Sequence, residues 1–518
     1  MNRGEMLSRL RDRRERWDMA IVGGGATGVG SAVDAASRGY SVVLLEQSDF
    51  GKGTSSRSTK LAHGGVRYLE QGNIPLVMEA LKERGLMRRN APHLVHDLAF
   101  VVPSYDWWEA PFYGVGLRLY DLLAGKYGFG RSRNLTREET LERLPTVRTD
   151  GLRGGIVYYD GQFDDTRLLI HMAETACEQG AVLLNYVRVH GLMREPDGFV
   201  SGVEARDEET GEEFRIEARV VVNATGAFCD TVRRMAGGVE PMIAPSQGVH
   251  LVFDGSFLGG ESAIMVPHTR DGRVMFALPW HGHTLVGTTD TPIQDVTVEP
   301  VALEEEIEFI LSTAGLYLRK APSRADVLSV FAGIRPLVRT GDAGNTAALS
   351  RDHTIRIEQS GLVTIAGGKW TTWRRMAEDC VDQAAMIGEL DERPAVTREL
   401  KIHGYHENAE EFGELEVYGA DAPAIREVMR VEPALSERLH PQLPYTAAEV
   451  VWAARFEMAR TVEDVLARRT RALFLNARAA VAMAPRTAEL MARELGEGAA
   501  WAERQVECFR SVASGYVV

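Results

Sequence analysis

Four cationic or titratable residues stand beside glycines or near the ends of predicted strands: Arg67, His250, Arg335 and Lys369. Arg and Lys normally project into solvent, so beside a glycine at the end of a buried strand they are better explained as clamps for an anion. Several such cations predict a phosphate or carboxylate substrate. A histidine is suited to take a proton from a substrate hydroxyl near neutral pH. His250 and His63 are the candidates, and a hydrogen-bonded structural histidine is an equal alternative for each one alone.

The stretch 17–46 supplies the first element that must position this chemistry. A short apolar strand leads into Gly23, Gly25 and Gly28, which have the spacing G-x-G-x-x-G. A helix and a second apolar strand follow, and Glu46 ends that strand. In such a unit the glycines make the tight turn, admit a pyrophosphate and let the helix pack on the strand, while the helix N-terminus attracts phosphate. Glu46 is placed to accept from a ribose hydroxyl. We therefore predict a dinucleotide site; a glycine-rich turn without a ligand is the alternative.

Three features favour FAD over NAD. A long polar loop at 47–72, rich in Gly, Ser, Thr, Lys and Arg, replaces a second βαβ repeat. Predicted strands return near residues 181, 220 and 362 around a β-rich insertion, so the nucleotide-binding fold is split. The glycine turn 367–372 can hold the far end of a long cofactor. Because no second dinucleotide motif is present, we expect electrons to come from an organic substrate as a hydride rather than from NAD(P)H.

The fold class predicted is α/β, α+β overall, in three parts. A Rossmann-like FAD-binding domain takes 17–95, 155–235 and 325–390. An antiparallel-sheet substrate domain takes 96–154 and 236–324. An all-helical domain takes 395–518; we expect it to serve packing or oligomer contacts, and we expect a homodimer.

Composition excludes several classes of protein. The 518 residues are 45% hydrophobic and 25% charged, which is typical of a large globular chain. A net charge of −14 argues against non-specific nucleic-acid binding. The four cysteines lie far apart without metal-ligand spacing, so we predict neither a metal site nor a disulfide framework, and a reducing cytoplasm fits. They are Cys177, Cys229, Cys380 and Cys508.

Two segments raise the question of a membrane, although no apolar run is long enough to predict a span. The aromatic and Leu-rich stretch 98–130, bounded by basic residues, has the composition of an interfacial membrane element; an ordinary core helix with an aromatic loop is the equal alternative. Residues 1–17 carry six arginines without an apolar centre, so they are not a secretory signal. They are either a basic segment that touches anionic lipid or a solvated leader helix.

The motifs IVGGGATGVG, TSSRSTKLAHGGVRYLEQG, VVNATGAFCD, GIRPL and GGKWTTWR together resemble the FAD-dependent, quinone-linked glycerol-3-phosphate dehydrogenases. The resemblance runs from about Asp18 into the helical C-terminal part, and it implies oxidation of sn-glycerol 3-phosphate to dihydroxyacetone phosphate at the cytoplasmic face of the cell membrane, with ubiquinone or menaquinone as acceptor. It implies that Arg67, Tyr68, His250, Arg335 and Lys369 bind the substrate, the last three also being catalytic candidates. It implies cofactor contacts at Gly23, Gly25, Gly28, Glu46, Ser58, Lys60 and Thr225. The predicted cofactor set is completed by His63, Gly226, Gly368 and Thr371 in the same motifs, and by Val187 in the strand predicted over 181–189.

Two departures from the family pattern are visible. Arg57 stands where the family commonly has a small or apolar residue, and nothing carries over to the extension before Trp17. The nearest rival is a glycerol-3-phosphate oxidase that passes electrons to oxygen; the length leaves no obvious room for the insertion that oxidases carry. An amine-oxidising flavoenzyme is disfavoured by the cationic cluster, and a flavin-binding scaffold without turnover is the rival from another class.

Overall fold

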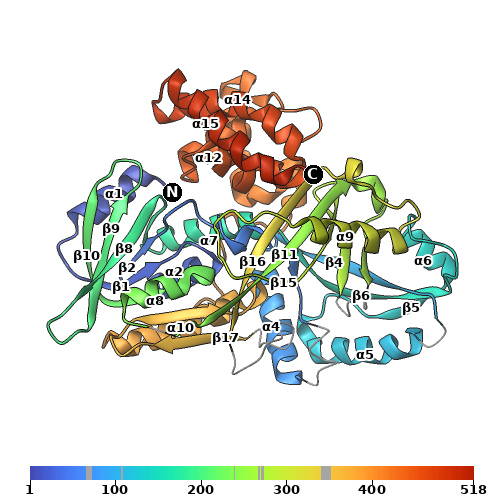
Figure 1. Cartoon of the computed structure of the whole chain (residues 1–518), viewed down its shortest axis with the longest axis horizontal. Coiled ribbons are helices and arrows are strands. Elements are labelled where there is room, and N and C mark those ends of the chain that lie inside the picture. Colours follow the sequence, from blue (N-terminus) through green and yellow to red (C-terminus); the bar gives the residue numbers. More distant parts are fainter. Residues whose placement is uncertain (66–72, 107–108, 239, 267–268, 270–273, 340–351) are drawn as a thin grey trace.

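The computed structural model describes residues 1–65, 73–106, 109–238, 240–266, 269, 274–339 and 352–518, without the side chains of residues 109–113 and 115. Two β-sheets lie side by side, and a helical domain formed by the end of the chain lies across them (Figure 1). The predicted fold class is therefore confirmed.

The first sheet has the strand order β17-β18-β10-β1-β2-β7, with β9 and β8 continuing from β10. Its central strands β1 and β2 are nearly continuous buried apolar runs, as expected where helices cover both faces of a parallel sheet. The expected returning strands are β7, β10 and β18, whereas the run predicted over 181–189 divides in two at Tyr186, which has φ 56°. The strands are β1 Trp17–Val22, β2 Val42–Leu45, β7 Val182–Leu184, β8 Val187–Arg194, β9 Val200–Asp207, β10 Glu213–Asn223, β17 His353–Ile357 and β18 Val363–Gly367.

Strand β10 changes partner along its length. Residues 213–217 pair antiparallel with β9, and residues 218–223 pair parallel with β1. One strand thus joins a three-stranded antiparallel ribbon to the nucleotide-binding sheet. The helices packed near this sheet are α2 Ala26–Ser37, α7 Asp165–Glu178, α8 Cys229–Met235 and α10 Trp373–Ile387.

The second sheet is mostly antiparallel, as predicted for the substrate domain, with the order β15-β11-β14-β13-β12-β4-β6-β3 and with β16 beside β11 and β5 beside β6. Strands β6 and β16 fall in ranges that we expected in the FAD-binding domain, yet they belong to this sheet. The strands are β3 Leu61–Ala62, β4 Val95–Ser104, β5 Arg133–Leu135, β6 Gly154–Phe163, β11 Ile243–Asp254, β12 Ala263–Val266, β13 Met275–Trp280, β14 His283–Gly287, β15 Thr291–Pro292 and β16 Ser329–Val338.

Among the residues that the structure describes, four helices accompany the second sheet. In one of them the predicted start is confirmed, because Thr136 and Glu139 form a reciprocal capping box. The aromatic stretch 98–130 divides between a buried strand, β4, and helix α5, so neither of its two interpretations describes all of it. The helices are α4 Ile74–Asn90, α5 Glu109–Ala124, α6 Arg137–Arg143 and α9 Glu304–Tyr317.

The N-terminal extension is neither a solvated leader nor a free basic segment. It forms helix α1, Arg3–Asp12, which packs beside β7 and buries Met6, Leu7 and Leu10. The Arg3 guanidinium is buried and donates to Asp207 Oδ1 at 2.9 Å. The extension is thus a helix, as one interpretation had it, but a packed one rather than a solvated one, because the partners of its buried side chains lie far along the chain. Contact of its exposed arginines with lipid stays a prediction.

The C-terminal domain is helical, as predicted. It contains α11 Ala422–Val431, α12 Ala447–Phe456, α13 Ala472–Leu475, α14 Ala477–Leu495 and α15 Ala499–Ala513, with a π-helical turn at Asp464–Arg469. Within the described part of the chain, no helix combines the length and apolarity needed to cross a bilayer.

Candidate active site

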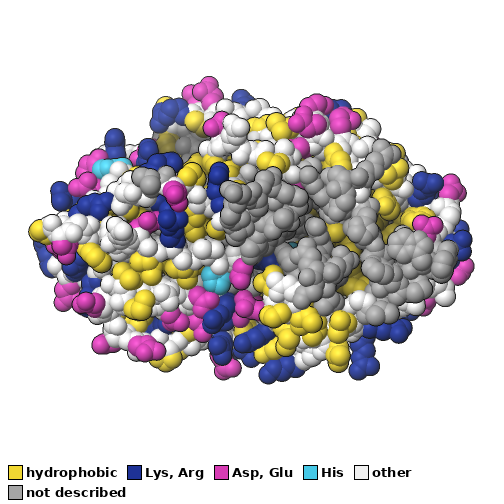
Figure 2. All heavy atoms as spheres, turned by 60° about the horizontal axis from the view of Figure 1, so that its bottom comes forward, with side chains coloured by type: hydrophobic (Ala, Val, Ile, Leu, Met, Phe, Trp, Pro, Cys, Tyr) yellow, Lys and Arg dark blue, Asp and Glu magenta, His cyan; other side chains and the backbone are white. Residues whose placement is uncertain are grey.

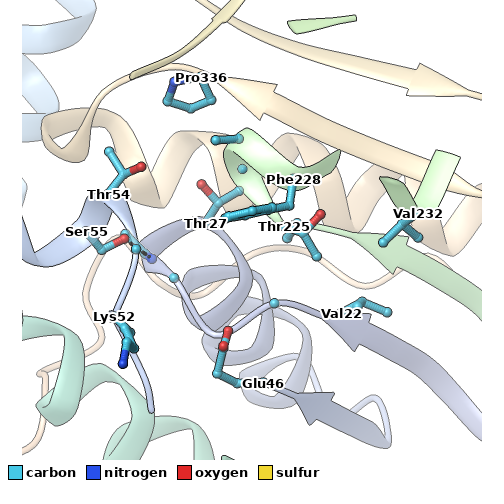
Figure 3. Close-up of a pocket in the computed structure, with 18 of the residues that line it drawn as sticks. Val22, Thr27, Glu46, Lys52, Thr54, Ser55, Thr225, Phe228, Val232 and Pro336 are labelled. Carbon is cyan, nitrogen blue, oxygen red and sulfur yellow. Dashed lines mark hydrogen bonds between the residues drawn. The ribbon is translucent and has the colours of Figure 1, made fainter. Parts of the chain in front are cut away.

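A cleft opens at the carboxyl ends of β1, β2 and β10, the edge at which α/β sheets bind ligands. Its walls are the glycine turn after β1, the end of β2, the polar loop, the turn after β10 and the turn after β18 (Figure 3). The residues that line it include Gly23, Gly25, Thr27, Glu46, Lys52, Thr54, Ser55, Arg188, Val189, Thr225, Gly226, Phe228, Pro336, Gly368, Lys369 and Trp370.

Two glycines are required by close backbone contacts beneath the cleft. A Cβ on Gly23, whose φ is +109°, would lie 2.7 Å from the carbonyl oxygen of Ala224. A Cβ on Gly28 would lie 1.9 Å from the carbonyl oxygen of Gly23. The motif therefore does what the spacing predicted: it turns the chain sharply and lets helix α2 lie directly on the strand end.

The Glu46 carboxylate is held by backbone donors and lines the cleft (Figure 3). Its Oε2 accepts from the Gly24 N–H at 2.7 Å and its Oε1 accepts from the Ser48 N–H at 2.9 Å. Burial raises the pKa of this carboxyl above its ordinary value. A fixed acid at the end of the second strand is the feature that a ribose hydroxyl requires.

The polar loop ties the two ends of the cleft together through Thr54 and Ser55. Ser55 Oγ accepts from the Ala26 N–H at 2.9 Å, at the start of α2, and the Ser55 carbonyl accepts from Trp370 Nε1 at 2.9 Å. Thr54 Oγ1 donates to the carbonyl of Ile334 on β16 at 2.6 Å. Glu46, the N-terminus of α2 and the glycine turn after β18 thus follow one another along a single cleft. This arrangement fits FAD.

The predicted cofactor residues divide between the cleft wall and its surroundings. Gly28 packs beneath the glycine turn. The Val187 N–H donates to the Glu46 carbonyl at 2.8 Å, while its neighbours line the cleft. Thr371 Oγ1 donates to the His63 carbonyl at 3.4 Å, behind the wall. Those that line the cleft are Gly23, Gly25, Glu46, Thr225, Gly226 and Gly368.

Ser58 and Lys60, predicted at the cofactor, instead face a buried carboxylate. Lys60 Nζ lies 2.6 Å from Asp165 Oδ2, and Ser58 Oγ donates to the same oxygen at 2.7 Å. Burial lowers the pKa of Lys60 to about 7. Arg471, from the helical domain, donates to the other Asp165 oxygen at 3.1 Å. This cluster supports the loop from behind, and the role of Lys60 at the cofactor stays a prediction.

His250 and Arg335 lie on the neighbouring strands β11 and β16. His250 is buried, stacks on Phe331 with ring centroids 4.9 Å apart, and places Nε2 2.9 Å from Thr59 Oγ1. Burial, together with the positive charges of Lys60 and Arg335, holds the pKa of His250 well below its ordinary value. The ring is therefore neutral near pH 7, as a proton acceptor must be.

Arg335 is anchored by the backbone of the second sheet. Its guanidinium donates to the Thr289 carbonyl at 3.0 Å and to the Gln247 carbonyl at 3.2 Å, and lies 3.4 Å from Asp290 Oδ1. The next residue, Pro336, lines the cleft, as does Lys369. Lys369 thus lies on the cleft wall and Arg335 directly precedes a wall residue, while His250 lies on the strand paired with that of Arg335. Their joint role at the substrate stays a prediction, and Arg67 and Tyr68 lie outside the described residues.

Sequence reasoning missed the contribution of the helical domain. Asp49, at the base of the loop, is fully buried. Its Oδ2 atom forms ion pairs with the guanidinium groups of Arg468 at 2.5 Å and Arg469 at 2.6 Å. Lys52, on the cleft wall, pairs with Glu463 at 2.8 Å. The one available signal was three arginines at 468–471 inside an apolar helical run, because buried arginines need acidic partners elsewhere.

Comparisons with known proteins agree with this geometry. The chain matches the family model described as FAD dependent oxidoreductase over residues 18–374, and the model described as the C-terminal domain of alpha-glycerophosphate oxidase over residues 363–505. It is 42% identical to the mitochondrial glycerol-3-phosphate dehydrogenase of Mus musculus, over 97% of this chain and 73% of that protein.

Two solved structures give the comparison in three dimensions. The glycerol-3-phosphate dehydrogenase from Bacillus halodurans, complexed with FAD, superimposes with a TM-score of 0.81 at 29% identity and covers 100% of this chain and 98% of that one. The L-alpha-glycerophosphate oxidase from Mycoplasma pneumoniae has a TM-score of 0.57 at 17% identity and covers 74% of this chain and 96% of that one. The second likeness concerns the fold alone.

Proposed function

Because this chain belongs to the family of FAD-dependent glycerol-3-phosphate dehydrogenases, we propose that it oxidises sn-glycerol 3-phosphate to dihydroxyacetone phosphate and passes the electrons to ubiquinone or menaquinone at a membrane surface. The observation that carries the substrate assignment is a neutral, buried His250 on β11, paired with the strand β16 that carries Arg335 and the cleft residue Pro336. A base and an anion clamp side by side suit a phosphorylated alcohol.

Each residue has a separable task in this proposal. FAD, when bound, supplies the acceptor for the hydride that leaves the substrate carbon. His250 takes the hydroxyl proton at Nδ1, since Nε2 is engaged by Thr59 Oγ1 and Nδ1 makes no hydrogen bond to any described residue. Arg335 and Lys369 hold the phosphate. Arg335 is preoriented by backbone carbonyls, so little side-chain entropy is lost when the substrate arrives.

Replacing the clamp tests the substrate assignment. We expect Arg335→Ala to raise KM for glycerol 3-phosphate about 10- to 150-fold, because a charged hydrogen bond contributes about 1.5–3 kcal/mol. FAD should remain bound, as judged from the flavin absorbance of the purified variant. Arg324→Ala, which removes an exposed arginine paired with Glu304, is the control. An unchanged KM in Arg335→Ala would remove this residue from the site.

The acceptor is tested by reducing the bound flavin anaerobically with glycerol 3-phosphate and then supplying a quinone analogue or oxygen. We expect rapid reoxidation by the quinone and slow reoxidation by oxygen. Stoichiometric hydrogen peroxide with no response to the quinone would identify an oxidase instead. The relatives named as dehydrogenases favour the first outcome.

An apolar surface on α4 and α5 supports the membrane assignment. The two helices pack on each other, and Figure 2 shows hydrophobic side chains among Lys and Arg on the face that carries them. Arg118 and Lys126 are exposed beside this surface and complement anionic headgroups. Its exposed apolar members are Ile74, Met78, Leu119 and Leu122, the last being 77% exposed.

Vesicle binding tests that surface. We expect Leu122→Asp to weaken partition onto vesicles with anionic phosphatidylglycerol about tenfold or more, since burying a leucine contributes about 1.5–3 kcal/mol. Val431→Asp, at a position 71% exposed on the helical domain, should leave partition unchanged. Equal partition of both variants would move the contact elsewhere. Location at the inner face of the cell membrane and a homodimer complete the proposal.

A further inference from the structure

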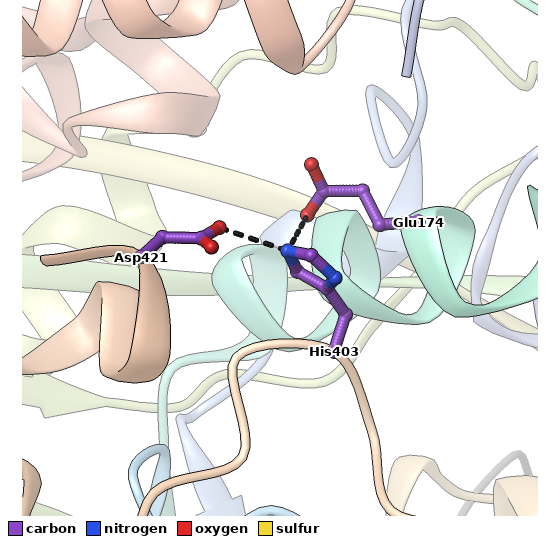
Figure 4. Close-up of side chains that lie close together, drawn as sticks. All are labelled: Glu174, His403 and Asp421. Atoms are coloured by element: carbon purple, nitrogen blue, oxygen red, sulfur yellow. Dashed lines mark hydrogen bonds and ion pairs between the residues drawn. The ribbon is translucent and has the colours of Figure 1, made fainter. Parts of the chain in front are cut away.

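A histidine outside the catalytic cleft is surrounded by carboxylates from two parts of the molecule (Figure 4). His403 lies near the start of the helical domain, Glu174 lies on α7, and Asp421 ends the 3₁₀ segment Ala409–Asp421. The Nε2 atom of His403 lies 2.8 Å from Asp421 Oδ2 and 3.6 Å from Glu174 Oε2. One ligand atom from each of the three residues falls within 4.8 Å of the others.

A third carboxylate fixes the orientation of the imidazole ring. Glu178, one turn after Glu174 on α7, places Oε1 2.6 Å from His403 Nδ1. The His171 ring packs edge-on against His403, with centroids 5.5 Å apart. A carboxylate that accepts from Nδ1–H and aims Nε2 at a common point is the arrangement found around metal-bound histidines.

The Glu174 side chain points to a missing ligand. It is 95% buried, and its Oε2 makes no hydrogen bond to any described residue, although it faces His403 (Figure 4). Two positively charged groups face this carboxylate beyond hydrogen-bond distance: His403 Nε2 lies 3.6 Å from Oε2, and the Met1 ammonium lies 4.0 Å from Oε1. A buried carboxylate oxygen that accepts no hydrogen bond is unfavourable, because its lost hydration is not fully replaced. A cation between Glu174, His403 and Asp421 would satisfy this oxygen.

We propose that Glu174, His403 and Asp421 bind a divalent transition-metal ion of the Zn²⁺ class, with water as the fourth ligand. Zinc bonds of about 2.0–2.2 Å in a tetrahedral site place ligand atoms roughly 3.3–3.5 Å apart. The separation of 3.6 Å between His403 and Glu174 already matches, and Asp421, whose side chain is 21% exposed, has room to withdraw from 2.8 Å. One imidazole with two carboxylates favours Zn²⁺ over Ca²⁺ or Mg²⁺, which prefer all-oxygen sites.

The ion would link the cofactor-binding part to the helical domain. Helix α7 packs on α2 in the former, while His403 and Asp421 precede α11 in the latter. Binding to the folded chain alone would stabilise it by mass action. The three residues are far apart in the sequence, so no ligand spacing indicated them. An ion bound here would contradict the sequence-based expectation of no metal site.

Calorimetric titration of the FAD-loaded, chelator-dialysed full chain with Zn²⁺ tests the proposal. We expect saturable binding of one ion with a micromolar or lower Kd, accompanied by a raised melting temperature. His403→Gln and Asp421→Asn should each weaken binding at least tenfold. The matched control is His190→Gln, because His190 makes an exposed pair with Glu213 at 2.8 Å and should keep wild-type affinity.

A measurement on the wild-type protein covers the case in which a variant fails to fold. The zinc X-ray absorption spectrum should show a nitrogen and oxygen shell near 2.0–2.1 Å with one imidazole and no sulfur. Sulfur ligands, wild-type affinity in a folded His403→Gln variant, or displacement of Zn²⁺ by equimolar Ca²⁺ would each overturn the proposal. So would the absence of saturable binding, and His403 would then be a charged link between carboxylates.

Discussion

The cofactor cleft and the contact between the cofactor-binding part and the helical domain are built on opposite principles. The glycine turn of the cleft is formed by backbone and small side chains, and a methyl group on Gly28 would collide with the carbonyl of Gly23. The contact is formed by long charged side chains with almost no exposure, such as Arg469 on Asp49. The first region should therefore be sensitive to size, and the second to charge.

The two regions are also connected. Lys52, on the cleft wall, pairs with Glu463, and Glu463 pairs with Arg468, which also holds Asp49. The helical domain thus fixes the loop that closes the cleft. Substitutions in the two regions test whether the cleft responds mainly to side-chain size and the contact mainly to charge.

The largest effect is expected from removing one charge at the contact. Asp49→Asn keeps the shape of the side chain but leaves Arg468 and Arg469 without their shared buried partner. Breaking such a pair costs about 3–5 kcal/mol of unfolding free energy, which urea denaturation would measure. Glu427→Gln, at an exposed pair with Arg430, should cause no measurable change. A loss no larger than that of the control would show that charge is not what stabilises the contact.

Acid should weaken the same contact. Burial raises the pKa of Asp49, but Arg469 and Arg468 outweigh it and hold this pKa at about 2. Arg468 and Lys52 likewise hold the pKa of Glu463 at about 2 against burial. Because both values lie below those of the unfolded chain, the stabilisation is complete above about pH 5 and is lost as the pH falls towards 2.

Unfolding curves between pH 6 and pH 2 measure this loss, which is about 2 kcal/mol for a shift of this size at Asp49. The Asp49→Asn variant should lose less stability over the same range, since one of the two carboxylates is absent. An identical pH dependence in the variant would assign the acid sensitivity to other groups.

A change of size should dominate in the cleft. Gly28→Ala adds one methyl group, which forces α2 away from β1 and is expected to weaken FAD binding by about 1–3 kcal/mol, or 5- to 150-fold in Kd. Flavin fluorescence titration measures it. Gly498→Ala is the control, because an added Cβ there meets nothing within 4 Å. Unaltered FAD affinity in Gly28→Ala would show that the helix can shift freely.

The smallest effect is expected from removing a charge in the cleft without changing size. Glu46→Gln still offers one oxygen to the Gly24 and Ser48 N–H groups, so we expect FAD affinity to fall only about tenfold. The same fluorescence titration applies, with the exposed Glu489→Gln as control. A loss greater than that caused by Gly28→Ala would reverse the distinction between the two regions.

Local signals made the cleft predictable from sequence. The glycine spacing at 23–28, the acid at Glu46 and the helix start at Thr136 each depend on residues close together in the chain, and the structure shows the elements that they predicted. The same reasoning identified the strands that carry His250 and Arg335. It also identified the split nucleotide-binding fold, because apolar runs and turns recur in order.

Partners distant in sequence made the rest unpredictable. An apolar run identifies β16 as a buried strand but does not say which sheet it joins. The resemblance implied a cofactor contact for Lys60, but no residue near it in the sequence indicates that it pairs with Asp165, more than a hundred residues later. The arginines of α1 suggested contact with solvent or lipid for the same reason, because no residue near Arg3 in the sequence indicates that its partner is Asp207.

The order of strands in the first sheet has a consequence for synthesis. Strand β18, which pairs beside β10, begins at Val363, and Arg468 comes a further hundred residues later. At about 5–20 residues per second, roughly 16–64 s separate the completion of β2 from the arrival of β18 at the ribosome exit. During that interval the growing chain carries strand edges without their neighbours. Because the turn after β18 forms part of the cleft wall, we expect the FAD site to be completed only late in synthesis.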